Sequence, residues 1–281
     1  MKKREKAIQF VKQHLNLFRC PVCQQGFVTV ENGSVRCPNQ HSIDIAKKGT
    51  LYFLNHAVKS EYDAEMLASR RRILTAGLFD PICQVFAQNM QADEIVLDVG
   101  SGEGTPLQKT LSFLQAPTAI GFDISTAGIN LATQLMSPAF FCVADLANLP
   151  FNNDSFTTIL DLFSPSAYAE FHRVLKPGAQ VLKVVPNADY LVELRHLLYD
   201  QSSQHAAYEN DQVVELFEKH FPNSENKRIR YTFEFSPQLL PDLIQMTPLH
   251  WGASQATIEK AKNSGLTHIS VDVTLLKGVV A

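Results

Sequence analysis

The sequence has no long apolar run, and this absence excludes the simplest membrane topology. No uninterrupted apolar stretch approaches the ~20 residues that a bilayer-spanning helix needs. The opening segment, MKKREKAIQF, also lacks the apolar region of a secretory signal peptide. We therefore expect a cytoplasmic protein without a membrane partner.

Cysteine is scarce, and five residues of this type are a poor basis for a disulfide framework. Cys83 and Cys142 stand alone in apolar patterns that are typical of inert core cysteines. Cys20, Cys23 and Cys37 instead crowd together near the N-terminus. This clustering indicates metal binding rather than disulfide bonding.

Net charge is also low, at −3 for 281 residues, but the charge is unevenly distributed. Residues 1–72 hold 13 Lys and Arg against 6 Asp and Glu, a net charge of +7. The remaining residues carry a net charge of −10. A basic N-terminal part favours a polyanion partner such as nucleic acid, although a solvated basic face without any partner has the same pattern.

A metal-ligand pattern lies within the basic part. Cys20, Cys23, Cys37 and His41 follow the spacing Cys-x2-Cys-x13-Cys-x3-His, and an Asn-Gly turn at 32–33 returns the chain between the two pairs. Three thiolates and one imidazole complete a tetrahedral zinc shell without a position for water. We therefore predict a structural zinc ion, the alternative being four residues that are well spaced by chance.

The chain after residue 94 alternates between strands and helices, which predicts a parallel sheet with helices on both faces. We expect a Rossmann-like α/β fold, mostly parallel, in which the last two strands pair antiparallel at the edge. The predicted strands cover 95–99, 118–122, 139–143, 156–162, 179–185, 228–235 and 267–276; the predicted helices cover 105–115, 126–136, 166–174, 188–199, 211–220, 236–245 and 255–262.

A glycine turn and three acids indicate a nucleoside site. The strand 95–99 runs into Gly100-Ser-Gly-Glu-Gly104, and Asp98, Asp123 and Asp145 end three successive strands. No Lys or Arg in the turn can neutralise a pyrophosphate, which favours S-adenosylmethionine over a dinucleotide. In this interpretation Asp98 faces the ammonium, Asp123 the ribose hydroxyls and Asp145 the adenine amine. A domain that binds no nucleotide is the alternative.

Several motifs together resemble a known family. The turn at 100–104, Phe122-Asp-Ile-Ser125, Asn148-Leu-Pro-Phe-Asn152 and Arg173-Val-Leu-Lys-Pro-Gly178 resemble the motifs of class I methyltransferases. With the upstream cysteines, Met66-x-x-x-Arg70-Arg71, Tyr190-Leu-Val-Glu-Leu194 and Gln245-Met-Thr-Pro-Leu-His-Trp251, the chain resembles the 23S rRNA (guanine-N1)-methyltransferases from about Phe18 onward. The basic helix at 2–16 is additional to that pattern.

The resemblance implies a reaction, a partner and further site residues. The family transfers methyl from S-adenosylmethionine to guanine N1 in a 23S rRNA hairpin, with the zinc domain and the cleft of a homodimer holding the RNA. By resemblance Phe79 and Tyr190 approach the cofactor. The remaining cofactor contacts expected beside the motifs are Gly100, Gly102, Glu103, Gly104, Thr105, Ile124 and Leu146.

The segment after the strand at 156–162, Asp161-Leu-Phe-Ser-Pro165, bears on the methyl acceptor. It lacks both the Asn/Asp-Pro-Pro-Tyr/Phe signature of exocyclic-amine methylation and a cysteine nucleophile, so a ring nitrogen fits. Asp161 is the candidate acceptor for the N1 proton, and a cap on the helix at 166–174 is the alternative. Since N1 is hidden in a duplex, the guanine must be unpaired, and Phe163, Tyr168 or Trp251 offer a stacking surface.

The sequence thus predicts three parts: a basic helix over 1–17, a zinc-binding RNA-recognition module over 18–60 and a methyltransferase domain over 61–281, with a helical insertion at 189–226. Two other functions are open at this point. One is a methyltransferase for small molecules, which has no use for the basic module. The other is an RNA-binding ribosome-assembly factor that does not bind S-adenosylmethionine.

Overall fold

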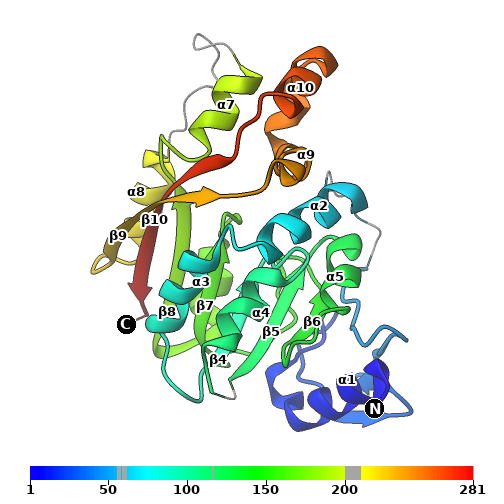
Figure 1. Cartoon of the computed structure of the whole chain (residues 1–281). Coiled ribbons are helices and arrows are strands. Elements are labelled where there is room, and N and C mark those ends of the chain that lie inside the picture. Colours follow the sequence, from blue (N-terminus) through cyan, green and yellow to red (C-terminus); the bar gives the residue numbers. More distant parts are fainter. Residues whose placement is uncertain (56–57, 59–61, 116, 200–209, 281) are drawn as a thin grey trace.

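A seven-stranded sheet forms the centre of the protein, in a computed structural model that describes residues 1–55, 58, 62–115, 117–199 and 210–280 (Figure 1). The strand order is β6-β5-β4-β7-β8-β10-β9, parallel from β6 to β8, with β10 antiparallel to both of its neighbours. The strands are β4 (Ile95–Val99), β5 (Thr118–Asp123), β6 (Phe140–Val143), β7 (Phe156–Leu162), β8 (Leu175–Pro186), β9 (Glu225–Glu234) and β10 (His268–Val279).

The burial of each strand follows its place in the sheet. In β4, at the centre, every residue after Ile95 is buried, as expected of a strand covered on both faces. In β9, at the edge, the second half alternates between half-buried and exposed residues. The predicted α/β fold, mostly parallel with an antiparallel edge, is therefore confirmed.

Helices cover both faces of this sheet and enclose two apolar clusters. One face carries α2 (Ala64–Thr75), α3 (Asp80–Gln88), α4 (Thr105–Ser112), α5 (Thr126–Ala132), α7 (Val192–Leu198), α9 (Leu240–Gln245) and α10 (Gln255–Lys262). The other face carries α6 (Tyr168–Val174), α8 (Asp211–His220) and the N-terminal segment. Short 3-10 helices are η1 (Leu15–Leu17), η3 (Pro237–Leu239) and η4 (Pro248–Gly252).

The N-terminal segment packs beside β6 at one end of the sheet (Figure 1). It comprises α1 (Lys3–Gln13) and a small antiparallel sheet of β1 (Thr29–Glu31), β2 (Ser34–Arg36) and β3 (Ser42–Asp44). The Phe18 ring packs against those of Phe140 and Phe151, 5.7 and 5.8 Å away. The peptide N–H of Phe53 donates to the carbonyl of Val143 at 2.8 Å, so the segment also extends the hydrogen bonding of β6.

Several element boundaries differ from the prediction: α4 and α5 end earlier than predicted, and β8 begins earlier, at Leu175 rather than at 179. Two further differences have local reasons. α7 begins at Val192 rather than at 188, because Leu191 adopts a left-handed φ of +53°. The predicted helix over 236–245 divides into η3 and α9, each with a proline in its first turn. The predicted domain boundary at 60–61 and the middle of the 189–226 insertion lie outside the described residues.

Across the described ranges, no helix combines the length and the apolar character that crossing a bilayer requires.

Candidate functional site

Four potential metal ligands meet in the N-terminal segment. The ligand atoms of Cys20, Cys23, Cys37 and His41 all lie within 4.8 Å of one another. His41 Nδ1 is 3.5 Å from the Sγ atoms of both Cys20 and Cys37, and Cys23 Sγ is 3.6 Å from Cys37 Sγ. A tetrahedral zinc ion with Zn–S bonds of about 2.3 Å sets its ligands about 3.5–3.8 Å apart. The predicted ligand set therefore fits a zinc ion with a filled shell.

Two short turns bring these ligands together. The peptide N–H of Gln24 donates to the Cys20 carbonyl at 2.9 Å, and that of Gln40 donates to the Cys37 carbonyl at 3.0 Å. Both glutamines adopt a positive φ of 64°. The peptide N–H of Gln25 lowers the pKa of the Cys23 thiol to about 6, which favours the thiolate that zinc binds.

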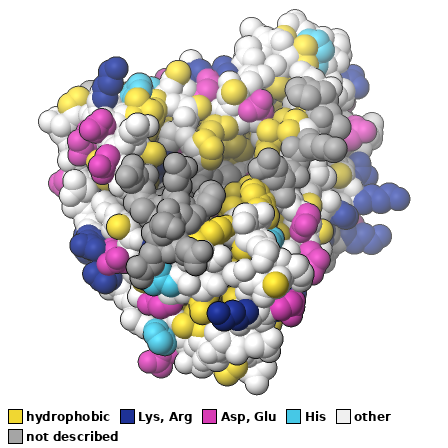
Figure 2. All heavy atoms as spheres, turned by 90° about the horizontal axis from the view of Figure 1, so that it is seen from above, with side chains coloured by type: hydrophobic (Ala, Val, Ile, Leu, Met, Phe, Trp, Pro, Cys, Tyr) yellow, Lys and Arg dark blue, Asp and Glu magenta, His cyan; other side chains and the backbone are white. Residues whose placement is uncertain are grey.

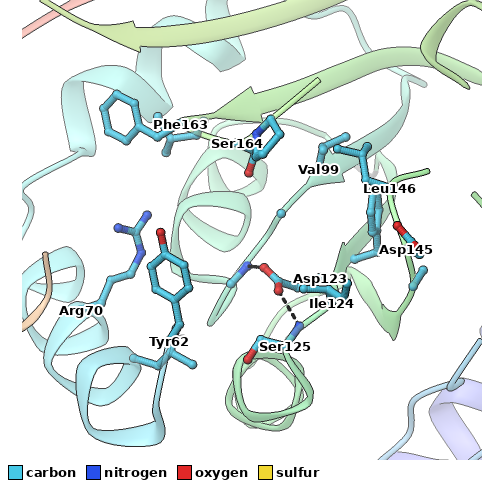
Figure 3. Close-up of a pocket in the computed structure, with 17 residues that line it drawn as sticks. Tyr62, Arg70, Val99, Asp123, Ile124, Ser125, Asp145, Leu146, Phe163 and Ser164 are labelled. Carbon is cyan, nitrogen blue, oxygen red and sulfur yellow. Dashed lines mark hydrogen bonds between the residues drawn. The ribbon is translucent and has the colours of Figure 1, made fainter. Parts of the chain in front are cut away.

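A cavity of about 430 Å³ opens at the carboxyl ends of β4, β5, β6 and β7, the edge at which α/β sheets hold ligands (Figure 3). Its volume lies within the roughly 300–1,000 Å³ of small-molecule sites. The lining residues are Tyr62, Leu67, Arg70, Val99, Gly100, Gly102, Phe122, Asp123, Ile124, Ser125, Ala144, Asp145, Leu146, Leu162, Phe163, Ser164 and Pro165.

Two glycines of the turn shape this cavity in different ways. Gly100 has a φ of +64°, and a Cβ there would collide with the Ser164 hydroxyl, so glycine lets the loop after β7 close over the turn. Gly102 has a φ of +55°, and a Cβ there would have no atom within 4 Å. Since Gly102 lines the cavity, its missing side chain leaves open space into which a ligand fits.

Asp123 connects the turn to the next strand. Its Oδ2 accepts from the peptide N–H of Gly102 at 2.8 Å, and its Oδ1 accepts from that of Ser125 at 2.7 Å (Figure 3). These two bonds fix the plane of the carboxylate at the cavity wall. A carboxylate in a fixed plane is suited to a pair of neighbouring hydroxyls, as in a ribose.

Acidic side chains crowd this edge of the sheet, where burial and mutual repulsion disfavour their charged forms. Burial, reinforced by the charges of Asp123 and Asp161, raises the pKa of Asp98 well above its ordinary value. Burial also raises the pKa of Asp123, although the hydrogen bonds from Ser125 and Gly102 oppose that shift. A ligand that brings positive charge would relieve this repulsion, and S-adenosylmethionine carries a sulfonium and an ammonium.

Within the part of the chain that the structure describes, Arg70 is the one Lys or Arg that lines the cavity. Its guanidinium lies 5.6 Å from the centre of the Phe79 ring, and its charge opposes the rise in the pKa of both Asp98 and Asp123. The neighbouring arginines have other partners: Arg71 forms an ion pair with Glu103 and Arg72 one with Asp242. Arg70 therefore supplies the cationic side of an otherwise acidic cavity.

Asp161, the predicted proton acceptor, is not among the lining residues and is fully buried. Its Oδ2 accepts from Lys183 Nζ and from the Ser166 hydroxyl, both at 2.8 Å, and its Oδ1 accepts from the Ser164 peptide at 3.1 Å. Burial raises the pKa of Asp161, and the Lys183 ammonium opposes that rise. This placement argues against direct proton transfer and makes Asp161 an anchor of the loop at 163–166.

Replacement of Asp161 by Asn is expected to lower the free energy of unfolding by about 3–5 kcal/mol, because the Lys183 ammonium is left buried without a counter-charge. Urea denaturation at pH 7 measures the change. The double variant Asp161→Asn, Lys183→Gln should recover most of the loss, since it removes both charges. Equal stability of the single variant and the wild type would contradict the buried ion pair.

The predicted cofactor residues divide into two groups. Those that line the cavity are Gly100, Gly102, Asp123, Ile124, Asp145 and Leu146; those that do not are Phe79, Asp98, Glu103, Gly104, Thr105 and Tyr190. The residues of the second group are buried, apart from the half-buried Tyr190. The Thr105 hydroxyl donates to Glu103 Oε2 at 2.5 Å. The rings of Phe79 and Tyr190 lie 5.6 and 5.1 Å from that of Phe163.

Sequence reasoning missed several lining residues, and Tyr62, Leu67 and Arg70 are the clearest. They lie on or just before α2, which precedes β4, and the motif Met66-x-x-x-Arg70-Arg71 was the available signal that this helix belongs to the site. Ser125 also lines it, and its place within the motif at 122–125 was the available signal. Of the aromatic candidates, Phe163 lines the cavity, whereas Tyr168 packs on α6 against His220, with ring centroids 4.2 Å apart.

Two protein-family models match the chain. One, a zinc-ribbon model described as "RlmA, N-terminal", matches residues 18–58, and the other, described as "Methyltransferase domain", matches residues 96–178. The first range holds the four zinc ligands, and the second holds the glycine turn and the acids that end β4, β5 and β6.

Curated relatives resemble nearly the whole chain. It is 35% identical over 275 residues to the "Putative 23S rRNA (guanine-N(1)-)-methyltransferase" of Bacillus subtilis, covering 94% of this chain and 97% of the relative. It is 25% identical to the 23S rRNA (guanine(748)-N(1))-methyltransferase of Streptomyces fradiae, covering 94% and 96%. A solved structure, phosphoethanolamine N-methyltransferase 2 of Haemonchus contortus with S-adenosylhomocysteine, is similar in fold, with a TM-score of 0.52, 15% identity and coverage of 79% and 58%.

Proposed function

The chain belongs to the 23S rRNA (guanine-N1)-methyltransferase family, and from that premise we propose that it methylates N1 of one guanine in a 23S rRNA hairpin loop. It is an S-adenosylmethionine-dependent methyltransferase with a structural zinc ion. The observation that carries the proposal is the 35% identity, which spans 94% of the chain and so includes the zinc ligands and the cavity together.

We propose a role for each charged group at the cofactor site. Asp123 holds the ribose hydroxyls, Asp145 the adenine amine and Asp98 the ammonium from behind the turn. Arg70 holds the methionine carboxylate, because it is the only cation among the described residues of the cavity wall. We also propose that the lining residues Gly100, Gly102, Ile124 and Leu146 contact the cofactor. The other predicted residues would position the cavity wall: Phe79, Glu103, Gly104, Thr105 and Tyr190.

S-adenosylmethionine would supply the methyl group from its sulfonium. The lone pair of guanine N1, freed as the N1 proton leaves, bonds to the methyl carbon while the bond from that carbon to sulfur breaks, and S-adenosylhomocysteine is the leaving group. The chain must hold the base in line and let the N1 proton leave. The loop at 163–165 lines the cavity and supports an acceptor base there. Asp161 anchors that loop, and we propose that the proton passes to water at the mouth. Much of the rate enhancement is then proximity.

RNA binding is proposed for the zinc module at 18–60 and the basic helix at 1–17, separate from the methyltransferase domain at 61–281. The net charge of +7 over residues 1–72 supports this assignment, because phosphate contacts dominate RNA affinity. A homodimer would add a second RNA-binding surface, and the cytoplasm is where ribosomal RNA is found. The basic zinc module disfavours a small-molecule methyltransferase, and the acidic cavity disfavours an assembly factor without catalysis.

Primer extension tests the reaction directly. After incubation with S-adenosylmethionine and 23S rRNA hairpin transcripts, reverse transcriptase is expected to stop at one guanine, because a methyl on N1 blocks base pairing. A hairpin with that guanine replaced by adenine should show no stop. Methyl incorporation without a stop would contradict methylation at N1, and absence of incorporation into any transcript would contradict an RNA substrate.

A further inference from the structure

Two exposed aromatic side chains meet beside the cavity. Tyr62, which is 45% exposed, lines the cavity just before α2. Trp251, which is 47% exposed, lies on η4 in the C-terminal part of the chain. Their ring centroids are 5.9 Å apart with an interplanar angle of 63°. The fold thus brings two aromatic rings from distant segments to one edge of the site.

The backbone that carries Trp251 is held in place. The Tyr199 hydroxyl donates to the Leu249 carbonyl, and a Cβ on Gly252 would lie only 2.8 Å from that hydroxyl oxygen. Trp251 is therefore presented by a short 3-10 helix packed against a neighbouring side chain. A tryptophan held at the surface presents a large flat apolar area, which is available to a ligand with a matching flat surface.

The two rings lie on the side where the acceptor must approach. Figure 3 shows Tyr62 and Arg70 across the cavity from Asp145 and Leu146. With the adenine proposed beside Asp145, the methionine half and its methyl group lie toward Tyr62. Figure 2 shows apolar side chains gathered toward the middle of the upper face and charged ones mostly around its margin.

We propose that Tyr62 and Trp251 form an aromatic seat on which the target guanine stacks while its N1 edge faces the methyl donor. The inference rests on the proposed function. A guanine that leaves the base stack of the RNA needs a new stacking surface, and the aromatic seat supplies it. A purine is the chemical class that fits, because its flat π-surface matches an indole ring. Phosphate contacts by the basic N-terminal part position the hairpin, and the seat holds the base.

Fluorescence offers a direct test, because Trp251 is the only tryptophan of the chain. Titration with the hairpin that gives the primer-extension stop is expected to quench the emission and to saturate at the concentration measured by filter binding. The matched hairpin, abasic at the target guanine, should still bind through its phosphates but should not quench. Equal quenching by both hairpins, or no quenching by either, would overturn the proposal.

Variants test the same seat by kinetics. Trp251→Leu and Tyr62→Leu are each expected to raise KM for the hairpin about tenfold to hundredfold, the effect of losing one base–aromatic stack. Trp251→Phe should retain most of the affinity, and Kd for S-adenosylmethionine should stay unchanged in both Trp251 variants, since Trp251 does not line the cavity. Phe113→Leu, which alters another aromatic residue that is 52% exposed and does not line the cavity, is the matched control.

The outcomes separate the seat from the reaction itself. A primer-extension stop with wild-type protein and an unchanged KM in both Leu variants would overturn the seat and leave the proposed function intact. No stop with wild-type protein on any hairpin would overturn the proposed function, and the seat with it. If Trp251→Leu fails to fold, Tyr62→Leu and the fluorescence of the wild-type chain decide the question.

Discussion

The variant Asp123→Asn is expected to bind S-adenosylmethionine at least about 100-fold more weakly than the wild type, as measured by calorimetry. Two hydrogen bonds from ribose hydroxyls to a carboxylate contribute about 1.5–3 kcal/mol each, and a tenfold change in Kd corresponds to about 1.4 kcal/mol. The substitution also alters the carboxylate that accepts from the Gly102 and Ser125 peptides. The loss of the ribose hydrogen bonds and the change in the turn both weaken the binding of S-adenosylmethionine, so we expect a large rise in Kd.

The same substitution at Asp145 is the matched control. Asp145 also lines the cavity and lies in the loop that follows β6. Its Oδ1 accepts from the peptide N–H of Ala147 at 2.9 Å. Its proposed partner is a single neutral amine, so Asp145→Asn should weaken binding by about tenfold or less. Retained zinc content and an unchanged melting temperature would exclude misfolding of Asp123→Asn. A change in Kd below threefold at Asp123 would contradict the ribose assignment.

Loss of the zinc ion is expected to abolish RNA binding while S-adenosylmethionine binding persists. The strands β1, β2 and β3 have only three residues each, so this module has little core of its own. Structural zinc contributes about 10–16 kcal/mol of binding free energy in small domains, which here is folding free energy. His41→Ala should therefore lower the zinc content and raise Kd for the hairpin more than about 100-fold.

The structure also predicts a limited effect of zinc loss on the cofactor site. The Thr50 hydroxyl donates to the Phe141 carbonyl at 2.7 Å, and the Val143 peptide donates to the Leu51 carbonyl at 2.9 Å. Because β6 leads to Asp145, unfolding of the module should weaken S-adenosylmethionine binding, though by less than about tenfold.

His268→Ala, a change at an exposed histidine on β10, controls for the loss of an imidazole. Filter binding and calorimetry provide the two affinities. Unchanged RNA affinity in His41→Ala would show that the module does not bind the hairpin. Equal loss of both affinities would show that the module and the methyltransferase domain unfold as one unit.

The sequence by itself determined the features that depend on local spacing. The zinc ligands are set by two short turns and one hairpin, so their spacing along the chain fixes their spacing in space. The acids at 98, 123 and 145 follow strands that are parallel, and parallel strands place their carboxyl ends at one edge. The cavity wall formed by Asp123 and Asp145 was predictable for that reason.

Only the tertiary structure decided which side chains complete that wall. Asp161 is near the end of its strand, like the other acids. Its carboxylate, however, forms a buried ion pair with Lys183 on the neighbouring strand β8. Tyr62 and Trp251 meet because α9, which directly precedes η4, packs against α2. Such contacts depend on how whole elements pack against one another. The spacing of residues within one element does not predict that packing.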